Sequence, residues 1–470
     1  MQEHVIPKRE DVPEEFTWNL GDMFESDEAW SAEFAAAQEL PARAAAFAGR
    51  LCESAETLYE YLQLEDEAGV RISKLYGYAS CKSDQDTANA FYQDMRGKAM
   101  SLYVAYAGAG AFATPEIIAV DDERFESFYK DEPRLETYRR VLYRVRRMAA
   151  HVLSEAEERL LAAAGEMAAS PDNIRSIFMN ADISFPAVKD AKGIEHTLTN
   201  ETFVPMLESE DRPLRKAAFE AYYNRLGEFK NTVAAALDGQ FKQLRFFSDA
   251  RNYPTTLAAA LDGNEVPEEV YENLIDAVHA NMDKMYRYVA LRKKLLGVEE
   301  LHMYDVYTPL VPDATQKISF DEAKETVLAA LAVLGEDYTD LLKKGFAERW
   351  IDVYENQGKR GGAYSTDVSR PHPYVLLNHK DTLDGMFTLA HEMGHALHSW
   401  HSCKNQPVCT SDYVIFVAEV ASTCNEVLLM RYLLSQTADK RERAYLINHF
   451  LDQFKGTVYR QTMFAEFELE

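Results

Sequence analysis

The sequence predicts a mainly α-helical protein with a small β element, and three observations support this fold class. Apolar residues recur at helical spacing over most of the 470 residues. Runs with strand character are few and short. Prolines and capping residues stand where the helical patterns begin or end. The length is sufficient for two or three hydrophobic cores or for one large helical body.

The N-terminal part is predicted to be helical throughout. Residues 28–165 form successive amphipathic patterns rich in Ala, Glu, Leu and Tyr. Breaks are expected near Ser83-Asp84, at Pro115 and at Pro133. No period repeats closely enough to indicate a solenoid.

Residues 182–198 differ from the sequence around them. An apolar run, Ile183–Val188, is followed by a polar turn at 190–193 and a second short run. This pattern is typical of a β-hairpin. We therefore predict an N-terminal helical domain, residues 1–200, that ends in the hairpin, and a second domain, residues 201–470.

Helical patterns return in the second domain. Asp211-Arg212-Pro213 is a good capped start for a helical stretch that continues to about residue 247. Further helices are predicted near 267–295 and 320–345. Two short strand-like runs, 363–365 and 374–377, follow them.

The next predicted helix carries the sequence His391-Glu392-Met393-Gly394-His395. Two histidines four residues apart project from one face of a helix, close enough to bind a single zinc ion. Glu392 points beside such a metal, where it can take a proton from a water molecule. Asp381 or Thr382 can cap this helix, and no proline interrupts it before Pro407. The alternative is a chance match, which the helical context makes less credible.

A hydrolytic zinc site needs a third protein ligand and one position open to water. The mostly apolar run 412–430 carries Glu419 and Glu426, and a spacing of seven places both on one helix face. A carboxylate in such a helix is costly unless it is paired with a cation or a metal. We predict Glu419 as the ligand, and Glu426 as an outer group that orients a histidine ligand through its other ring nitrogen. The alternative is a pair of carboxylates solvated at a helix edge.

Several segments resemble oligoendopeptidase F, a bacterial member of the thimet-oligopeptidase-like zinc peptidases. The main segments are residues 391–400, 416–422, 425–426, 359–365, 373–378 and 303–307. The resemblance covers most of the chain and is most specific after residue 200. It implies a zincin-type helical fold with a deep substrate channel, one zinc ion, and cytosolic cleavage of short unstructured peptides. It also implies zinc ligation by His391, His395 and Glu419, with Glu392 as the base.

The two strand-like runs directly before the zinc helix are candidates for substrate binding. An edge strand can pair with the main chain of a peptide, and Gly361 and Gly362 would let that chain come close. A structural hairpin with glycines at its turn accounts for the pattern equally well, and the resemblance favours substrate binding. The candidate contacts are Gly361, Gly362, Ala363 and Tyr364, with His379 as a further candidate without an assigned role.

Composition narrows the class of protein. A net charge of -27 argues against nucleic acid and anionic membrane as partners. Five cysteines form no disulfide framework, which suits a reducing compartment. The N-terminus has no apolar core or cleavage signal, and the most apolar stretch is too short to span a bilayer. We therefore predict a cytoplasmic protein that acts on short peptides; the sequence indicates no oligomeric state.

These observations together predict a zinc-dependent endopeptidase that hydrolyses internal bonds of short oligopeptides. One alternative is a zinc carboxypeptidase or dipeptidyl carboxypeptidase, which would need a basic anchor for the substrate C-terminus; Arg360 and Arg370 are available. A second alternative is an inactive peptide-binding scaffold. The intact ligand set and Glu392 argue against a scaffold, because a binder has no need of the base.

The last part of the sequence is predicted to be a helix, residues 445–470, with apolar positions such as Phe454 and Phe467. No glycine, proline or polar cap ends it. Proteins of the resembling family continue well beyond this point. We therefore expect the second domain to be truncated at its C-terminus, and residues 1–470 to be an incomplete catalytic unit with low turnover.

Overall fold

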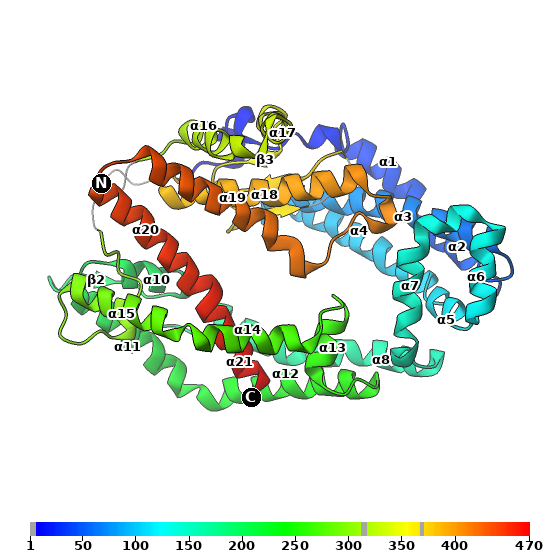
Figure 1. Cartoon of the computed structure of the whole chain (residues 1–470), viewed down its shortest axis with the longest axis horizontal. Helices are drawn as coiled ribbons and strands as arrows, with labels where there is room; N and C mark the ends of the chain where they lie inside the picture. The colour runs from blue at the N-terminus through cyan, green and yellow to red at the C-terminus, as the bar shows by residue number, and fades with distance from the viewer. Residues whose placement is uncertain (1–5, 312–316, 367–370) are drawn as a thin grey trace. The chain divides into compact units, whose positions relative to one another are not determined.

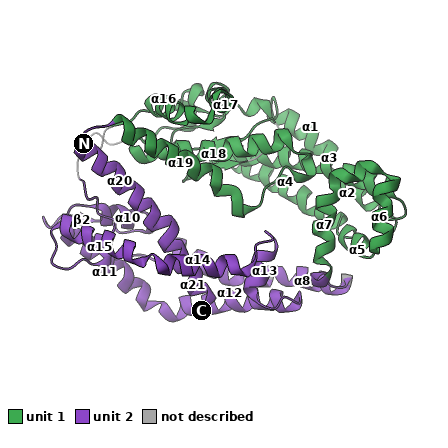
Figure 2. Cartoon of the chain, in the orientation of Figure 1, with its two compact units in different colours: residues 1–149, 315–436 green, residues 150–314, 437–470 purple. Residues whose placement is uncertain are grey.

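The computed structural model describes residues 6–311, 317–366 and 371–470, and these residues are mainly α-helical (Figure 1). The predicted fold class is confirmed in this respect. Contacts divide the chain into two compact units (Figure 2). Unit 1 contains Met1–Ala149 and Thr315–Gln436, and unit 2 contains Ala150–Ala314 and Thr437–Glu470. The units do not follow the predicted division after residue 200, because each combines two stretches that are distant in sequence.

The first stretch of unit 1 is a series of helices. They are α1 (Asp27–Ala37), α2 (Leu40–Ala45), α3 (Ala55–Gln85), α4 (Ala90–Ala109), α5 (Ala113–Ile118), α6 (Asp122–Asp131) and α7 (Arg139–Arg147). The break predicted at Pro133 is present, since a 3-10 helix begins there. The break predicted near Ser83-Asp84 is present, since α3 ends at Gln85 and α4 begins at Ala90. Pro115 lies in the first turn of α5, where a helix tolerates proline.

In the described residues of its second stretch, unit 1 has four α-helices and a small sheet. The helices are α16 (Phe320–Leu331), α17 (Glu336–Ala347), α18 (Leu383–Asn405) and α19 (Ile415–Gln436). The strands are β3 (Ile351–Asp352), β4 (Tyr364–Thr366) and β5 (Tyr374–Leu376), in the order β3-β5-β4. β5 runs parallel to β3 and antiparallel to β4. Strand β3 was not predicted, because two residues are too few to give a periodic signal.

The core of unit 1 joins its two stretches. Tyr374 and Leu376 of β5 belong to the same buried cluster as Trp30, Leu58 and Leu75 of the N-terminal helices. The indole of Trp18 donates a hydrogen bond to the carbonyl of Val375 at 2.7 Å. The N-terminal helices therefore support the sheet that precedes α18.

Unit 2 contains the remaining helices and the hairpin. Its helices are α8 (Glu155–Ala168), α9 (Ser170–Ile177), α10 (Asn200–Glu208), α11 (Arg212–Glu228), α12 (Lys230–Ala250), α13 (Thr256–Asp262), α14 (Glu268–Ala280), α15 (Met282–Leu296), α20 (Lys440–Phe454) and α21 (Arg460–Leu469). The hairpin is present as β1 (Val188–Lys189) and β2 (Glu195–His196), shorter than predicted. Asp211 caps α11 as expected. A π-helical turn, Lys455–Tyr459, interrupts the helix predicted over 445–470.

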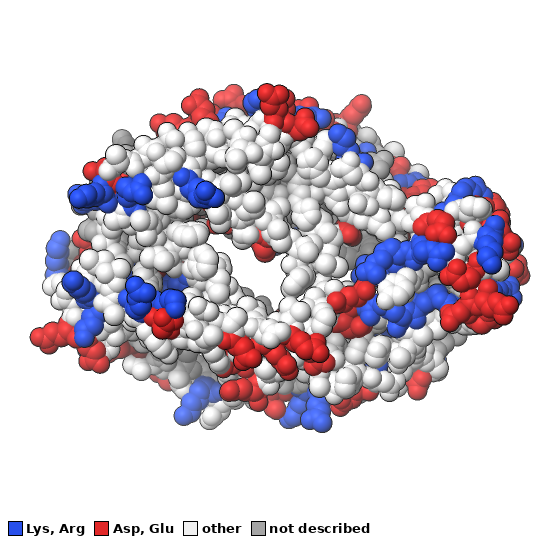
Figure 3. Space-filling view, viewed as in Figure 1, with Lys and Arg blue, Asp and Glu red and all other residues white. Residues whose placement is uncertain are grey.

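Among the described residues, no single helix is long and apolar enough to cross a membrane; one bent pair, Ala90–Ile118 with Asp122–Asp131, passes on length and composition alone. Acidic and basic side chains both cover the face in Figure 3, and basic ones gather over α7. Two of the arginines there are neutralised locally, since Arg139 pairs with Glu136 and Arg146 pairs with Asp122.

Candidate active site

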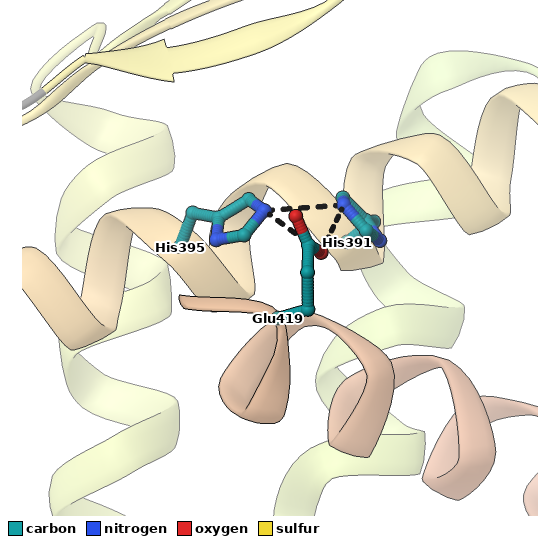
Figure 4. Close-up of side chains that lie close together, drawn as sticks. All are labelled: His391, His395 and Glu419. Carbon is teal, nitrogen blue, oxygen red and sulfur yellow. Dashed lines mark hydrogen bonds and ion pairs between the residues drawn. The ribbon is translucent and has the colours of Figure 1, made fainter. Parts of the chain in front are cut away.

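Helix α18 carries the two histidines. The side chain of Thr382 caps its N-terminus by accepting a hydrogen bond from the N–H of Gly385 at 3.1 Å, so that Thr382 rather than Asp381 begins the helix. The middle of α18 is largely buried in unit 1. His391 and His395 are one turn apart and half-buried, and both imidazoles point to the same side of the helix (Figure 4).

Helix α19 crosses α18 beside these histidines and supplies Glu419. The crossing is close because Gly394 has no side chain: a Cβ there would lie 2.6 Å from Cα of Ser422. Such a distance is far inside van der Waals contact, so that only glycine fits at this position. Figure 4 shows Glu419 rising from α19 between the two imidazoles. Its side chain is 61% exposed, yet it lies with the histidines rather than apart from them.

The three donor atoms have the spacing of a metal site. Nε2 of His391 and Nε2 of His395 are 3.1 Å apart. Oε2 of Glu419 is 3.3 Å from the first nitrogen and 3.4 Å from the second. Zinc ligands at about 2.0–2.2 Å in a tetrahedron are separated by about 3.3–3.6 Å. The three separations, 3.1 to 3.4 Å, are close to those of one face of such a tetrahedron, and the fourth corner would be left for water or substrate.

Other side chains hold two of the three candidate ligands, His391 and Glu419, in place. The second ring nitrogen of His391, Nδ1, is hydrogen-bonded to Glu426. Burial is the largest single effect on the pKa of His391 and lowers it. The hydrogen bond to Glu426 and the negative charges of Glu426, Glu392 and Glu419 together outweigh burial, so that the pKa is raised. The hydroxyl of Ser422 donates to Oε2 of Glu419 at 2.7 Å. The structure thus places Glu426 where an orienting group for His391 was predicted.

Glu392 lies beside the ligands and is 7% exposed. Burial raises its pKa to about 7, and the negative charges of Glu419 and Glu426 act in the same direction. The nearby His391 and a main-chain hydrogen bond from Ser365 act in the opposite direction. A carboxyl group with a pKa near neutrality can both accept and donate a proton at physiological pH.

Ser365 is in β4, whose open edge faces Glu392. Val375 stands opposite Ser365, and its N–H donates to the carbonyl of Trp350 on the other side of β5. The main-chain groups of Val375 therefore point away from β4, so that Val375 and Ser365 form a non-hydrogen-bonded pair. The N–H and C=O of Ser365 consequently point out of the open edge of the described sheet. The N–H of Ser365 donates to Glu392, so that the C=O of Ser365 is the main-chain group that this edge offers to an extended peptide.

The candidate substrate residues Gly361–Tyr364 lead into this strand. The amide of Asn378 donates to the carbonyls of Arg360 and Gly362, at 3.0 and 2.8 Å. The hydroxyl of Tyr364 donates to Asp84 at 2.7 Å. Asp84 is thus a partner of β4, and this contact accounts for its burial in the last turn of α3.

His379, the remaining candidate for substrate contact, is held by packing rather than by hydrogen bonds. Its ring is 7% exposed and packs edge-on against Phe320 and Tyr354, and neither ring nitrogen has a hydrogen-bond partner in the described part of the chain. Its ring also limits the space at Gly385, where an added Cβ would lie 3.2 Å from it. Burial lowers its pKa. These contacts give His379 a packing role at the start of α18, and its role in substrate contact stays a prediction.

Sequence reasoning missed Ser422, Asn425 and Tyr338. Ser422 and Asn425 lie on the same face of α19 as Glu419 and Glu426, so that their spacing was a usable signal. Tyr338 lies in α17, where nothing in the local sequence relates it to the histidines. Its contact with Asn425 is a product of tertiary packing.

A mainly helical fold that brings together two histidines and a glutamate with the spacing of metal ligands, beside a buried carboxyl group, is typical of a metal-dependent peptidase. Comparison with known sequences supports the same class of protein. Residues 205–470 match the profile of Peptidase family M3, and residues 116–185 match that of Oligopeptidase F. The chain belongs to peptidase family M3, so that the predicted metallopeptidase class and the resemblance to oligoendopeptidase F are confirmed.

Individual relatives are similar over nearly the whole chain. Oligopeptidase PepF of Bacillus subtilis is 46% identical over 98% of this chain and 69% of its own length. Group B oligopeptidase PepB of Streptococcus agalactiae is 41% identical over 98% of this chain and 76% of its own length.

Solved structures are similar in fold. Oligoendopeptidase-F from Enterococcus faecium has a TM-score of 0.69 and 35% identity, covering 94% of this chain and 74% of that chain. A Chlamydophila abortus protein has a TM-score of 0.87 and 31% identity, covering 99% of this chain and 78% of that chain.

Proposed function

We propose that this chain is a zinc-dependent endopeptidase that hydrolyses internal bonds of short peptides. The observation that carries the proposal is the spacing of the three donor atoms in unit 1, which fits the ligand face of a tetrahedral zinc site. The names of the relatives, oligopeptidase and oligoendopeptidase, support the substrate class.

One zinc ion would be held by Nε2 of His391, Nε2 of His395 and a carboxylate oxygen of Glu419. Two imidazoles and one carboxylate are a donor set that zinc hydrolases use, with one position open. The hydrogen bond from Nδ1 of His391 to Glu426 fixes the tautomer, so that the lone pair of Nε2 is free for a metal. Ser422 orients the carboxylate of Glu419 in the same way.

The chemistry is hydrolysis of an amide. When bound, zinc supplies a Lewis acid that makes the attacking water more acidic and stabilises negative charge on the carbonyl oxygen. Glu392 accepts the proton that this water loses and delivers it to the leaving amine nitrogen, so that the carboxylate is regenerated. Its low exposure and pKa near 7 suit both transfers.

The substrate would lie along the open edge of β4. Main-chain pairing with this edge binds an extended peptide without reading its sequence. Gly361 and Gly362 are exposed and Gly362 has a φ of 85°, so that no side chain obstructs the approach at that turn. Ala363 and Tyr364 complete the candidate segment, with Tyr364 anchored on Asp84.

A carboxypeptidase is less well supported. Its substrate anchor would be Arg360 or Arg370. The guanidinium of Arg360 is 52% exposed and is shared with the buried Asp84 at 3.4 Å, so that it is partly committed within unit 1. Arg370 lies outside the described residues. A cytoplasmic location is proposed on the cysteine count, since five is an odd number without the spacing of a disulfide framework and suits a reducing compartment.

The test is digestion of a peptide blocked at both ends, with mass-spectrometric mapping of the products. We expect internal cleavage that stops when a chelator removes the metal and returns when zinc is added. Cleavage only of peptides with a free C-terminus would favour the carboxypeptidase. A zinc-loaded protein that binds peptides and leaves them intact would favour the scaffold.

A further inference from the structure

We propose that Asn425, oriented by Tyr338, is a positioning residue that fixes α19 against α18 and thereby sets the ligand geometry of His391 and Glu419. This proposal rests on the metal site proposed above. Asn425 does not touch the metal position or the substrate edge. Its action is on the two helices that carry the ligands.

The contacts of Asn425 connect three helices of unit 1. Its side chain is 1% exposed. The amide Nδ2 donates to the main-chain carbonyl of Ala390 in α18 at 3.0 Å. The hydroxyl of Tyr338 in α17 donates to Oδ1 of the same amide at 2.9 Å. Ala390 directly precedes His391, so that the bond holds α19 to α18 at the ligand itself.

The neighbours of Asn425 on α19 contact the ligands. Glu426 follows it in sequence and is hydrogen-bonded to His391. Ser422, one turn before Asn425, donates to Glu419. A shift of α19 along α18 would therefore move the ligand Glu419 and the partner of His391 together. One point of attachment controls both.

Close packing alone does not fix this position. At the crossing, the main chain of Ser422 lies where a side chain on Gly394 would be, so that the contact at this point is between two main chains. A helix advances about 1.5 Å per residue. A zinc site tolerates deviations of only about 0.2 Å in its ligand distances. The hydrogen bond to the carbonyl of Ala390 is directional, so that it fixes the position of α19 along α18 more tightly than van der Waals contact does.

Tyr338 determines which way the amide points. Burial raises the pKa of Tyr338 to about 12, so that its hydroxyl keeps its proton at neutral pH and remains a donor. A donor facing Oδ1 leaves Nδ2 directed at the Ala390 carbonyl. Without it, the amide can turn, and two oxygens would then face each other. A buried amide that loses a partner destabilises the fold, so that a hydrophobic residue would be the simpler choice if packing were the only role.

The test compares Asn425→Asp and Tyr338→Phe with Tyr138→Phe as the matched control. Asp is close in size to Asn, but its carboxylate cannot donate to the Ala390 carbonyl. Tyr138 is also a buried tyrosine of unit 1 whose hydroxyl donates to a side-chain oxygen, that of Asp66 at 2.6 Å. It has no described contact with α18 or α19, so that Tyr138→Phe reports the stability cost of losing such a bond.

Zinc affinity is measured by competition with a chelator on metal-free protein, and ligand geometry by the visible spectrum of the cobalt(II) form. We expect zinc affinity to fall about 10- to 100-fold in Asn425→Asp and less in Tyr338→Phe, with an altered cobalt spectrum in both. Tyr138→Phe should lower the melting temperature and leave both metal readouts unchanged.

Parental zinc affinity and cobalt spectrum in folded Asn425→Asp and Tyr338→Phe would overturn the proposal. If Asn425→Asp does not fold, Tyr338→Phe decides. The outcomes also separate this proposal from the metal site: a parent protein without zinc affinity contradicts the site, whereas a zinc-binding parent with unaffected variants contradicts only the role of Asn425.

Discussion

Glu392 is a buried acid whose location opposes stability and favours catalysis. Its carboxyl is 7% exposed, and burial raises its pKa to about 7. A carboxylate without a cation at such a position is costly in the folded state. The same environment gives a proton acceptor matched to neutral pH. We therefore expect substitutions of Glu392 to change both turnover and stability.

Replacing Glu392 by Gln should abolish most activity while the metal stays bound. The variant retains His391, His395 and Glu419 but loses the proton acceptor, so that we expect turnover to fall by about 10²- to 10⁴-fold. Metal content by atomic emission and peptide turnover are measured on the same preparation. The assignment of Glu392 as base fails if the variant keeps more than about a tenth of parental turnover.

The same substitution should stabilise the metal-free protein in a pH-dependent manner. Between the ordinary pKa of 4.5 and the folded value of about 7, the unfolded chain is ionised at Glu392 while the folded chain is protonated. The folded state then binds more protons, and the free energy of unfolding falls as pH rises through this window. Glu392→Gln removes this loss. The free energy of unfolding of the variant, relative to that of the parent, should therefore increase by about 2–3 kcal/mol from pH about 4.5 to about 7 and then stay constant.

This difference is measured by denaturant unfolding of chelator-treated protein at several pH values. Glu60→Gln, an exposed position on α3, controls for the loss of one negative charge. If the difference in free energy of unfolding between Glu392→Gln and the parent is the same at every pH, the raised pKa of Glu392 is contradicted.

At the scale of elements, the crossing of α18 and α19 forms the site. Neither helix alone carries a complete set of donors: α18 supplies two nitrogens and α19 supplies the carboxylate. Gly394 allows the close approach, and Ser422 occupies the space that a side chain would take. The distance between the two helix axes is thus a determinant of metal binding.

Gly394→Ala should therefore weaken both the fold and the metal site. The added Cβ would be 2.6 Å from Cα of Ser422, a main-chain atom that cannot move without the helix. We expect a lower denaturation midpoint and at least about a tenfold loss of zinc affinity, because Glu419 moves with α19. Gly69→Ala is the matched control: Gly69 is in the middle of α3, and an added Cβ meets nothing within 4 Å.

In that control, alanine should stabilise the helix by about 0.5–1 kcal/mol through its better helix propensity, with zinc affinity unchanged. Equal effects of the two substitutions, measured by denaturant unfolding and chelator competition, would contradict the role assigned to the crossing.

At the scale of the whole molecule, the candidate ligands and Glu392 all belong to unit 1. Binding stabilises the state that holds the ligand by RT ln(1 + [L]/Kd), about 2.7 kcal/mol at a hundredfold excess over Kd. Metal binding is expected to stabilise those segments whose local opening would release the metal. The stabilisation should therefore be distributed unevenly along the chain.

Hydrogen exchange followed by mass spectrometry can test this distribution. On addition of zinc to metal-free protein, we expect exchange to slow in α18 and α19, by up to about a hundredfold where opening releases the metal. Helices α11 and α12 of unit 2 should exchange at unchanged rates. Equal protection of both units would mean that the metal acts on a larger cooperative unit than the one that holds it.

Much of the molecule could be predicted from the sequence because the signals are local. Helical periodicity identified α14 to α17 and α18, and a spacing of four placed His391 and His395 on one face. The seven-residue spacing of Glu419 and Glu426 likewise selected the helix face that meets α18. Each inference needed only the geometry of one helix.

The remainder was decided by tertiary structure, because it depends on residues that are distant in sequence. The hydrogen bond from Tyr338 to Asn425 spans 87 positions, and that from Tyr364 to Asp84 spans 280. Strand β3 is defined by its pairing with β5 rather than by a pattern of its own. The two units are discontinuous in sequence for the same reason. The sequence by itself therefore determined which groups are candidates for the chemistry, whereas packing decided what holds these groups in place. The physical reason is that periodicity identifies one face of a helix but not the element that this face contacts.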